Sequence, residues 1–184
     1  MEFNIVNYLN HLWLGTFVDK ITEFISLIPF IIVLWATLAI FASLTNKKYG
    51  FWIFATVLIA LALHFAISEG IFKHLLSSIF FRERPWVTFS NDIIAIGKQF
   101  TDSSFPSSHM ASTLAVLIVL VYYYKKVWPW ALIFVLIMAF SRMHNGMHYL
   151  SDVLMGSFLG IIYGLLAIYI VKKIRKENPE KIDG

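Results

Sequence analysis

The residues best suited to chemistry lie in three polar stretches that are far apart along the chain. They are Arg84 with its neighbours, the segment PSSH from Pro106 to His109, and the segment SRMHNGMHYLSD from Ser141 to Asp152. Arginine binds phosphate oxygens through fork-shaped N–H donors, and the start of a helix adds free backbone N–H groups. The stretches together predict a cradle for a phosphate dianion, built from Arg84, Ser107, Ser108 and Arg142.

Two histidines would complete a phosphoryl-transfer reaction in such a cradle. One imidazole can attack phosphorus, and another can protonate the departing oxygen. His148 and Asp152 are four residues apart, so on one helix face the carboxylate could hold the ring in one tautomer and leave its other nitrogen free to attack. His109 then remains as the general acid. These three residues predict catalysis through a covalent phosphohistidine.

The elements that must position these residues are membrane helices. The 184-residue chain is 59% hydrophobic and 14% charged, which is too apolar for an ordinary soluble domain. Apolar runs near bilayer length predict five spans, at residues 21–44, 51–72, 109–124, 128–140 and 153–171. Residues 4–20 are more polar and predict an amphipathic helix at the membrane interface. We therefore expect an all-α, polytopic membrane bundle that forms one domain over residues 1–184.

The basic residues predict the orientation of this bundle. Nine of the fifteen Lys and Arg residues fall on one side, namely Lys47, Lys48, Lys125, Lys126, Lys172, Lys173, Arg175, Lys176 and Lys181. The positive-inside rule makes that side cytoplasmic. All three polar stretches then lie at the outer face, and the tail that begins near Lys172 is a solvated basic end. We expect a protein of the cytoplasmic membrane with its site facing the periplasm or the cell exterior.

The three stretches resemble the signature motifs of the type-2 phosphatidic acid phosphatase superfamily, whose membrane members remove phosphate from lipid phosphates and diphosphates without a metal. The resemblance rests on Arg84-Pro85, on PSSH, and on a third motif that matches at every defining position from Ser141 to Asp152. It implies a lipid substrate, no cofactor, no nucleic acid and no obligatory protein partner. The roles it implies are His148 as nucleophile, Asp152 as its partner, His109 as acid, and Arg84, Ser107, Arg142 and the Ser108 amide as phosphate ligands.

Two positions depart from the pattern of that family. Ser108 stands where glycine is usual, and its backbone N–H survives the change. Ser77 stands where lysine is usual, seven residues before the arginine. Lys73 lies one helical turn earlier and either reaches the site or pairs with Glu69 at i, i+4. Arg82 is the other candidate substitute.

Two different classes of function also fit part of the sequence. His144, His148 and Asp152 are spaced four and four, which on an unbroken helix could bind zinc. Gly146 predicts a turn there instead, and a zinc site would leave both arginines unused. A transporter is disfavoured because the expected spans carry neither a repeat nor a polar stripe. His64 stands alone in a span and predicts a hydrogen-bonded interior histidine.

The substrate is suggested by the resemblance alone. For a small bacterial member it suggests undecaprenyl diphosphate, with lipid A 1-phosphate and phosphatidylglycerophosphate as alternatives. Specificity would come from residues 73–105 and from the aromatic-rich N-terminal helix.

Overall fold

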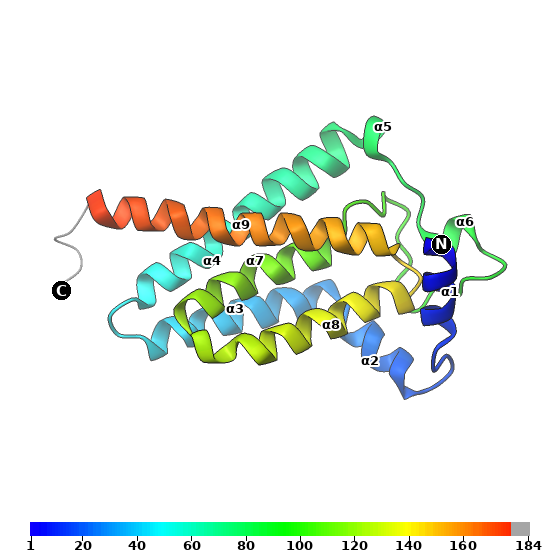
Figure 1. Cartoon of the computed structure of the whole chain (residues 1–184), viewed down its shortest axis with the longest axis horizontal. Helices are drawn as coiled ribbons and strands as arrows, with labels where there is room; N and C mark the ends of the chain where they lie inside the picture. Colours follow the sequence, from blue (N-terminus) through cyan, green and yellow to red (C-terminus); the bar gives the residue numbers. More distant parts are fainter. Residues whose placement is uncertain (178–184) are drawn as a thin grey trace.

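Five long helical segments form the body of the protein. The computed structural model describes residues 1–177, in which the regular elements are helices and no strand occurs (Figure 1). The long segments are α3 (Ile28–Thr45), α4 (Gly50–His64) with its π-helical continuation η1 (Phe65–Leu75), α7 (Ser108–Tyr123), α8 (Trp128–His144) and α9 (Leu150–Glu177). Within residues 1–177, four stretches are long and apolar enough to cross a membrane, and the fifth apolar helix, Ser108–Tyr123, is shorter. The predicted all-α membrane bundle is confirmed.

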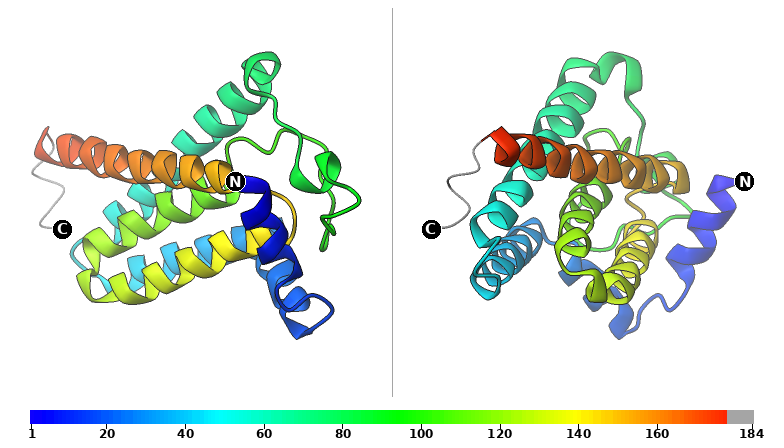
Figure 2. Two further views of the ribbon diagram at one scale, coloured as in Figure 1. Left: turned by 45° about the vertical axis from the view of Figure 1, so that its right-hand side comes forward. Right: turned by 60° about the vertical axis from the view of Figure 1, so that its left-hand side comes forward.

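The shorter elements gather at one end of the bundle. They include α1 (Glu2–His11), α2 (Phe17–Ile25), α5 (Ser77–Phe80) and α6 (Pro85–Thr88). Figures 1 and 2 show this end opposite the α3–α4 turn and the far end of α9. The 3-10 turn η2 (Lys125–Val127) joins α7 to α8. The long polar connection and the α8–α9 loop therefore lie at the same end, as the span topology predicts.

Close packing between α7 and α9 fixes that end of the bundle. Gly156, Gly160 and Gly164 recur every four residues along α9. A Cβ at Gly156 would collide with the carbonyl of Ser107, and a Cβ at Gly160 or Gly164 would collide with α7 one or two helical turns farther along. Small residues at this spacing let two helix backbones approach closely in a membrane. The start of α7, where Ser107 is the N-cap, is thereby held against the start of α9.

The N-terminal region corrects two expectations. The single amphipathic helix expected at residues 4–20 is two helices, separated where Trp13 and Gly15 adopt positive φ angles of 62° and 77°. Thr16 caps the second helix by accepting a hydrogen bond from the Val18 N–H. The first span begins at Ile28 rather than at residue 21, because α2 ends at Ile25 and Pro29 stands in the first turn of α3. The end of the predicted basic tail, Lys181 included, lies outside the described residues.

Candidate active site

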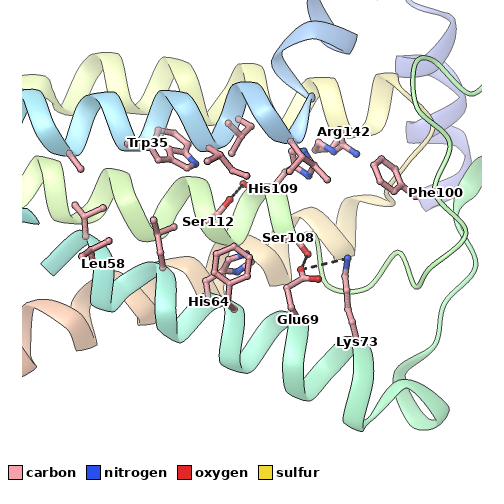
Figure 3. Close-up of a pocket in the computed structure, with 18 of the residues that line it drawn as sticks. Trp35, Leu58, His64, Glu69, Lys73, Phe100, Ser108, His109, Ser112 and Arg142 are labelled. Atoms are coloured by element: carbon pink, nitrogen blue, oxygen red, sulfur yellow. Dashed lines mark hydrogen bonds and ion pairs between the residues drawn. The ribbon is translucent and has the colours of Figure 1, made fainter. Parts of the chain in front are cut away.

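The three polar stretches converge on one cavity of about 570 Å³. Figure 3 shows Ser108, His109, Lys73 and Arg142 around its end near the loops, while its deeper walls are apolar and come largely from α3 and α4. The charged and hydroxylic residues that line it are Glu69, Lys73, Arg84, Asp102, Ser108, Arg142 and the two histidines His109 and His148. A polar head site thus opens into a hydrocarbon-lined channel.

His148 lies in the loop between α8 and α9, not on a helix. Gly146 makes this turn with a φ of 70°, and a Cβ there would collide with Ile93. The Nδ1 atom of His148 is 2.8 Å from the Ser104 carbonyl oxygen. Since a carbonyl only accepts, Nδ1 carries the hydrogen and Nε2 is unprotonated. The lone pair of Nε2 accepts a long hydrogen bond of 3.4 Å from Nη1 of Arg84, so the nitrogen suited to attack faces the phosphate cradle.

Asp152 supports this loop differently from what its spacing predicts. Its Oδ2 is 3.8 Å from His148 Nδ1, too far for a hydrogen bond, and accepts from the Tyr149 N–H at 2.8 Å instead. Its Oδ1 accepts from Arg82 Nη1 at 2.8 Å. The expectation that both residues share a helix face is wrong, because α9 begins only at Leu150. A backbone carbonyl holds the ring, and the carboxylate lies just behind it.

Arg82 organises the back of the site rather than the cradle. Besides Asp152, its guanidinium donates to the Ser151 hydroxyl at 2.6 Å and to Glu2 at 2.8 Å, and it stacks 3.8 Å over the Tyr149 ring. Glu2 also accepts from the Ser151 N–H at 2.8 Å. Arg82 is not among the residues that line the cavity. Its donors are therefore engaged behind the cavity, and a role for Arg82 in place of the missing lysine stays a prediction.

Arg84 and Lys73 share one carboxylate at the mouth of the cavity. Arg84 is buried, and its Nη2 donates to Asp102 Oδ1 at 2.8 Å. Lys73 Nζ donates to Asp102 Oδ2 at 3.0 Å and lies 3.9 Å from Glu69. Partial burial opposes ionisation of Asp102, but Lys73 and Arg84 hold its pKa below the usual range. Both expectations for Lys73 are met in part, since it lines the cavity and approaches Glu69.

Arg142 is a buried cation for which the described residues provide no ion pair. Its side chain is 2% exposed, and no acceptor in the described part of the chain reaches its Nε. A buried unpaired charge is costly, so this geometry favours a bound anion. Ser107, at the start of α7, has a buried hydroxyl that also lacks a partner, although it does not line the cavity. The Ser108 hydroxyl donates to the Glu69 carboxylate.

His109 faces the cavity from the first turn of α7. Its Nε2 is 2.9 Å from the carbonyl oxygen of Ser26, the C-cap residue of α2, so Nε2 donates and Nδ1 is the remaining ring nitrogen. Sequence reasoning missed Ser26, Ser104, Asp102 and Glu2. Asp102 and Ser104 lie four and two residues before Pro106 of PSSH and could have been noticed, whereas Glu2 and Ser26 carry no local signal.

His144 lies outside the site and does not line the cavity. Its ring lies between the Leu9 carbonyl at 2.8 Å and Asp19 Oδ1 at 2.9 Å, so it fastens α1 and α2 to the end of α8. Over residues 1–177 no group of three His, Cys, Asp or Glu side chains is arranged to hold a metal. The zinc constellation of His144, His148 and Asp152 is therefore not formed.

The charge around His148 leads to a pH prediction. Burial, followed by the charges of Arg142, Arg84 and Lys73, lowers the pKa of His148 well below its usual range. A lowered pKa keeps the nucleophilic neutral ring populated at lower pH, so we expect the acid limb of kcat/KM to lie below pH 6.5, the ordinary histidine value. Lys73→Gln removes one positive charge and should move that limb to higher pH. Lys172→Gln, at the opposite end of the bundle, is the control.

Comparing the two profiles cancels ionisation of the substrate itself. An acid limb that is the same in the wild type and in Lys73→Gln would contradict this electrostatic account of His148.

Comparisons of sequence find a family model and several relatives that resemble this chain. The PAP2 superfamily profile matches residues 50–176. The undecaprenyl-diphosphatase BcrC of Bacillus subtilis is 34% identical over 101 residues, which are 54% of this chain and 51% of that protein. The lipid A 4'-phosphatase of Bacteroides thetaiotaomicron is 26% identical over 152 residues, which are 75% of this chain and 65% of that protein. The chain thus spans less than two thirds of the length of either relative.

The arrangement of helices is also that of a solved structure. The crystal structure of LpxE from Aquifex aeolicus superposes with a TM-score of 0.63 at 19% identity, covering 91% of this chain and 92% of that one. This likeness concerns the fold. The profile match extends over most of the chain and includes all three polar stretches. The chain therefore belongs to the PAP2 superfamily.

Proposed function

We propose that this protein is a membrane lipid phosphatase that works through a phosphohistidine on His148. The observation that carries the proposal is the cavity, at whose head the unprotonated Nε2 of His148 lies near the guanidinium of Arg142, above an apolar channel. The Nε atom of Arg142 has no partner among the described residues. A small water-soluble phosphate ester would leave this apolar channel unfilled. A lipid phosphate fills both parts, with its head among the cations and its chain between α3 and α4.

The residues suggest a two-step reaction. Nε2 of His148 attacks phosphorus, the P–O bond to the lipid breaks, and His109 gives a proton to the departing oxygen. In this step His109 acts as the imidazolium, which carries two N–H groups. Because its Nε2 donates to the Ser26 carbonyl, the proton that is transferred is the one on Nδ1. Water then attacks the phosphohistidine, His109 takes a proton from that water, and phosphate leaves with His148 restored.

The positive charge that the transition state requires comes from side chains in this proposal. Arg84 and Arg142 are both buried at the head of the cavity, where fixed donors stabilise developing charge more than they would in water. The Asp102 carboxylate accepts one hydrogen bond from Arg84 and one from Lys73. An incoming phosphate must therefore displace this carboxylate or bind to the same two cations beside it. We propose that catalysis is independent of metal ions.

Undecaprenyl diphosphate is the first proposed substrate, supported by the likeness to BcrC. A phosphorylated lipid A is the second, supported by the likeness to a lipid A 4'-phosphatase, and phosphatidylglycerophosphate is a third. The basic residues Lys47, Lys48, Lys125 and Lys126 lie at the end of the bundle opposite the site. By the positive-inside rule this supports a site on the outer face of a bacterial cytoplasmic membrane.

The test is phosphate release by the purified protein from these lipids, each with and without excess EDTA. We expect release from at least one lipid at an unchanged rate in EDTA, together with inhibition by vanadate. Complete loss of turnover in EDTA that zinc restores would refute the metal-independent mechanism. Spheroplasts given a membrane-impermeant short-chain lipid phosphate show which side of the membrane the active site faces. An outward-facing site hydrolyses this substrate in intact spheroplasts, and hydrolysis only after permeabilisation would contradict it.

A further inference from the structure

Three polar side chains interrupt the apolar part of the cavity below the phosphate cradle. Trp35 comes from α3, His64 ends α4, and Ser112 lies on α7, and all three line the cavity. Figure 3 shows them at a similar depth, farther from the loops than Ser108 and Glu69. We call this set the polar belt. It surrounds the channel from three helices rather than extending along one.

The polar belt has hydrogen-bonding capacity that the protein does not use. Trp35 and His64 are each 3% exposed, and neither Nε1 of Trp35 nor Nδ1 of His64 has a partner in the described structure. The expectation of a hydrogen-bonded interior histidine is therefore wrong for the Nδ1 atom of His64. Ser112 makes one long bond of 3.2 Å to the His109 carbonyl. Buried polar groups are nearly always paired in folded proteins, so these atoms require an explanation.

A channel that binds only hydrocarbon would be better lined by apolar side chains of similar size. The neighbours of the polar belt are of that kind, since Ile31, Ile32, Val57, Leu58 and Leu61 line the same cavity. Both rings also contact other aromatic rings. The Trp35 ring lies edge-on to Phe134 with 5.6 Å between ring centroids, and the His64 and Phe65 ring centroids are 5.1 Å apart. Indole offers a donor only, and a neutral imidazole offers one donor and one acceptor. The hydroxyl of Ser112 already donates to the His109 carbonyl and keeps its acceptor lone pairs. Trp35 and His64 can therefore donate to an oxygen atom of a ligand.

The position of the belt limits which oxygen atoms it can meet. Ser112 lies four residues beyond Ser108 on α7, which is about 6 Å along the helix axis. A group at that level is attached to the lipid directly below the phosphate that is transferred. In a prenyl diphosphate it is the inner phosphate, and in an acylated phospholipid it is an ester or amide carbonyl. A simple alkyl or prenyl monophosphate carries hydrocarbon there.

We infer that the polar belt of Trp35, His64 and Ser112 binds a second oxygen-bearing group of the lipid, one helical turn below the transferred phosphate. This inference rests on the proposed lipid phosphatase function and narrows its substrate class. It makes the enzyme selective for lipids that carry such a group. A site built to pair with a polar group discriminates strongly against the analogue that lacks it, because its own polar atoms are then left unpaired.

Two matched pairs of substrates test the inference. The first pair is a prenyl diphosphate and the same prenyl monophosphate, and the second is a diacyl phosphatidic acid and its dialkyl ether analogue. In one of these pairs, we expect Trp35→Phe, His64→Leu and Ser112→Ala each to lower kcat/KM by about fivefold to tenfold for the lipid that carries the second oxygen-bearing group. The kcat/KM for the other lipid of that pair should be nearly unchanged. The affected pair identifies whether the group is a phosphate or a carbonyl.

Leu58→Met is the control, because it alters an apolar wall of the same channel while nearly conserving volume. If the belt variants lower both members of each pair equally, or change neither, the belt only packs or holds water and the inference fails. If the wild type releases phosphate from none of the four lipids, the proposed function fails instead.

Discussion

His148→Ala should abolish phosphate release from every lipid and from an activated ester such as a nitrophenyl phosphate. The ring provides the nucleophile in our proposal, and its Nε2 is the atom that the Ser104 carbonyl leaves free. Removing a covalent pathway typically costs about four orders of magnitude or more in kcat. The measurement is single-turnover and steady-state hydrolysis of both substrates. Wild type denatured in alkali during turnover should carry a base-stable, acid-labile phosphoryl group that is absent from the variant.

His109→Ala should behave differently because its proton is needed only by a poor leaving group. We expect a large loss on a lipid monophosphate, whose alkoxide leaves badly, and a much smaller loss on the nitrophenyl ester. Asp152→Asn should fall between the two histidine variants on both substrates. If His109→Ala is impaired equally on both while His148→Ala keeps the activated ester, the acid and the nucleophile have been assigned in reverse.

Most of the convergence at the site could be predicted from the sequence, because it follows from parity. Each apolar run of bilayer length carries the chain across once, so stretches that follow even numbers of crossings share a face. Arg84, His109, Arg142 and His148 accordingly line one cavity. The family membership and the all-α bundle are confirmed, while the role of each site residue stays a prediction.

The supporting contacts could not be predicted, for identifiable physical reasons. The acceptor that orients His148 is a backbone carbonyl, at Ser104, and every residue type has one. Glu2 reaches Arg82 across 80 positions of the chain, and this pairing depends on how α1 packs at the end of the bundle. The spacing of His148 and Asp152 suggested a helical pair, but Gly146 ends that continuity with its positive φ. Local periodicity places elements well and places long-range polar partners poorly.

Arg142→Met should inactivate the enzyme and at the same time raise its melting temperature. The guanidinium is 2% exposed, and no counter-ion for it is found among the described residues. Loss of one fixed donor to the transition state costs about 10² to 10³ in kcat. Methionine fills similar space without the desolvation cost, and replacing buried charge by a packed apolar side chain can stabilise a protein by about 1 kcal/mol or more. Thermal unfolding in detergent and kcat on one lipid are measured together.

Arg82→Met provides the matched control, because the same substitution removes an arginine that is paired. Arg82 contacts Asp152, which is fully buried, and Glu2 at 2.8 Å each. Its loss leaves the Asp152 carboxylate without its cation, so we expect destabilisation of about 2 kcal/mol or more. Vanadate should raise the melting temperature of the wild type and of Arg82→Met but not of Arg142→Met, since a ligand stabilises only a protein that binds it. If Arg142→Met instead unfolds at a lower temperature than the wild type, its guanidinium is compensated within the fold and is not held for an anion.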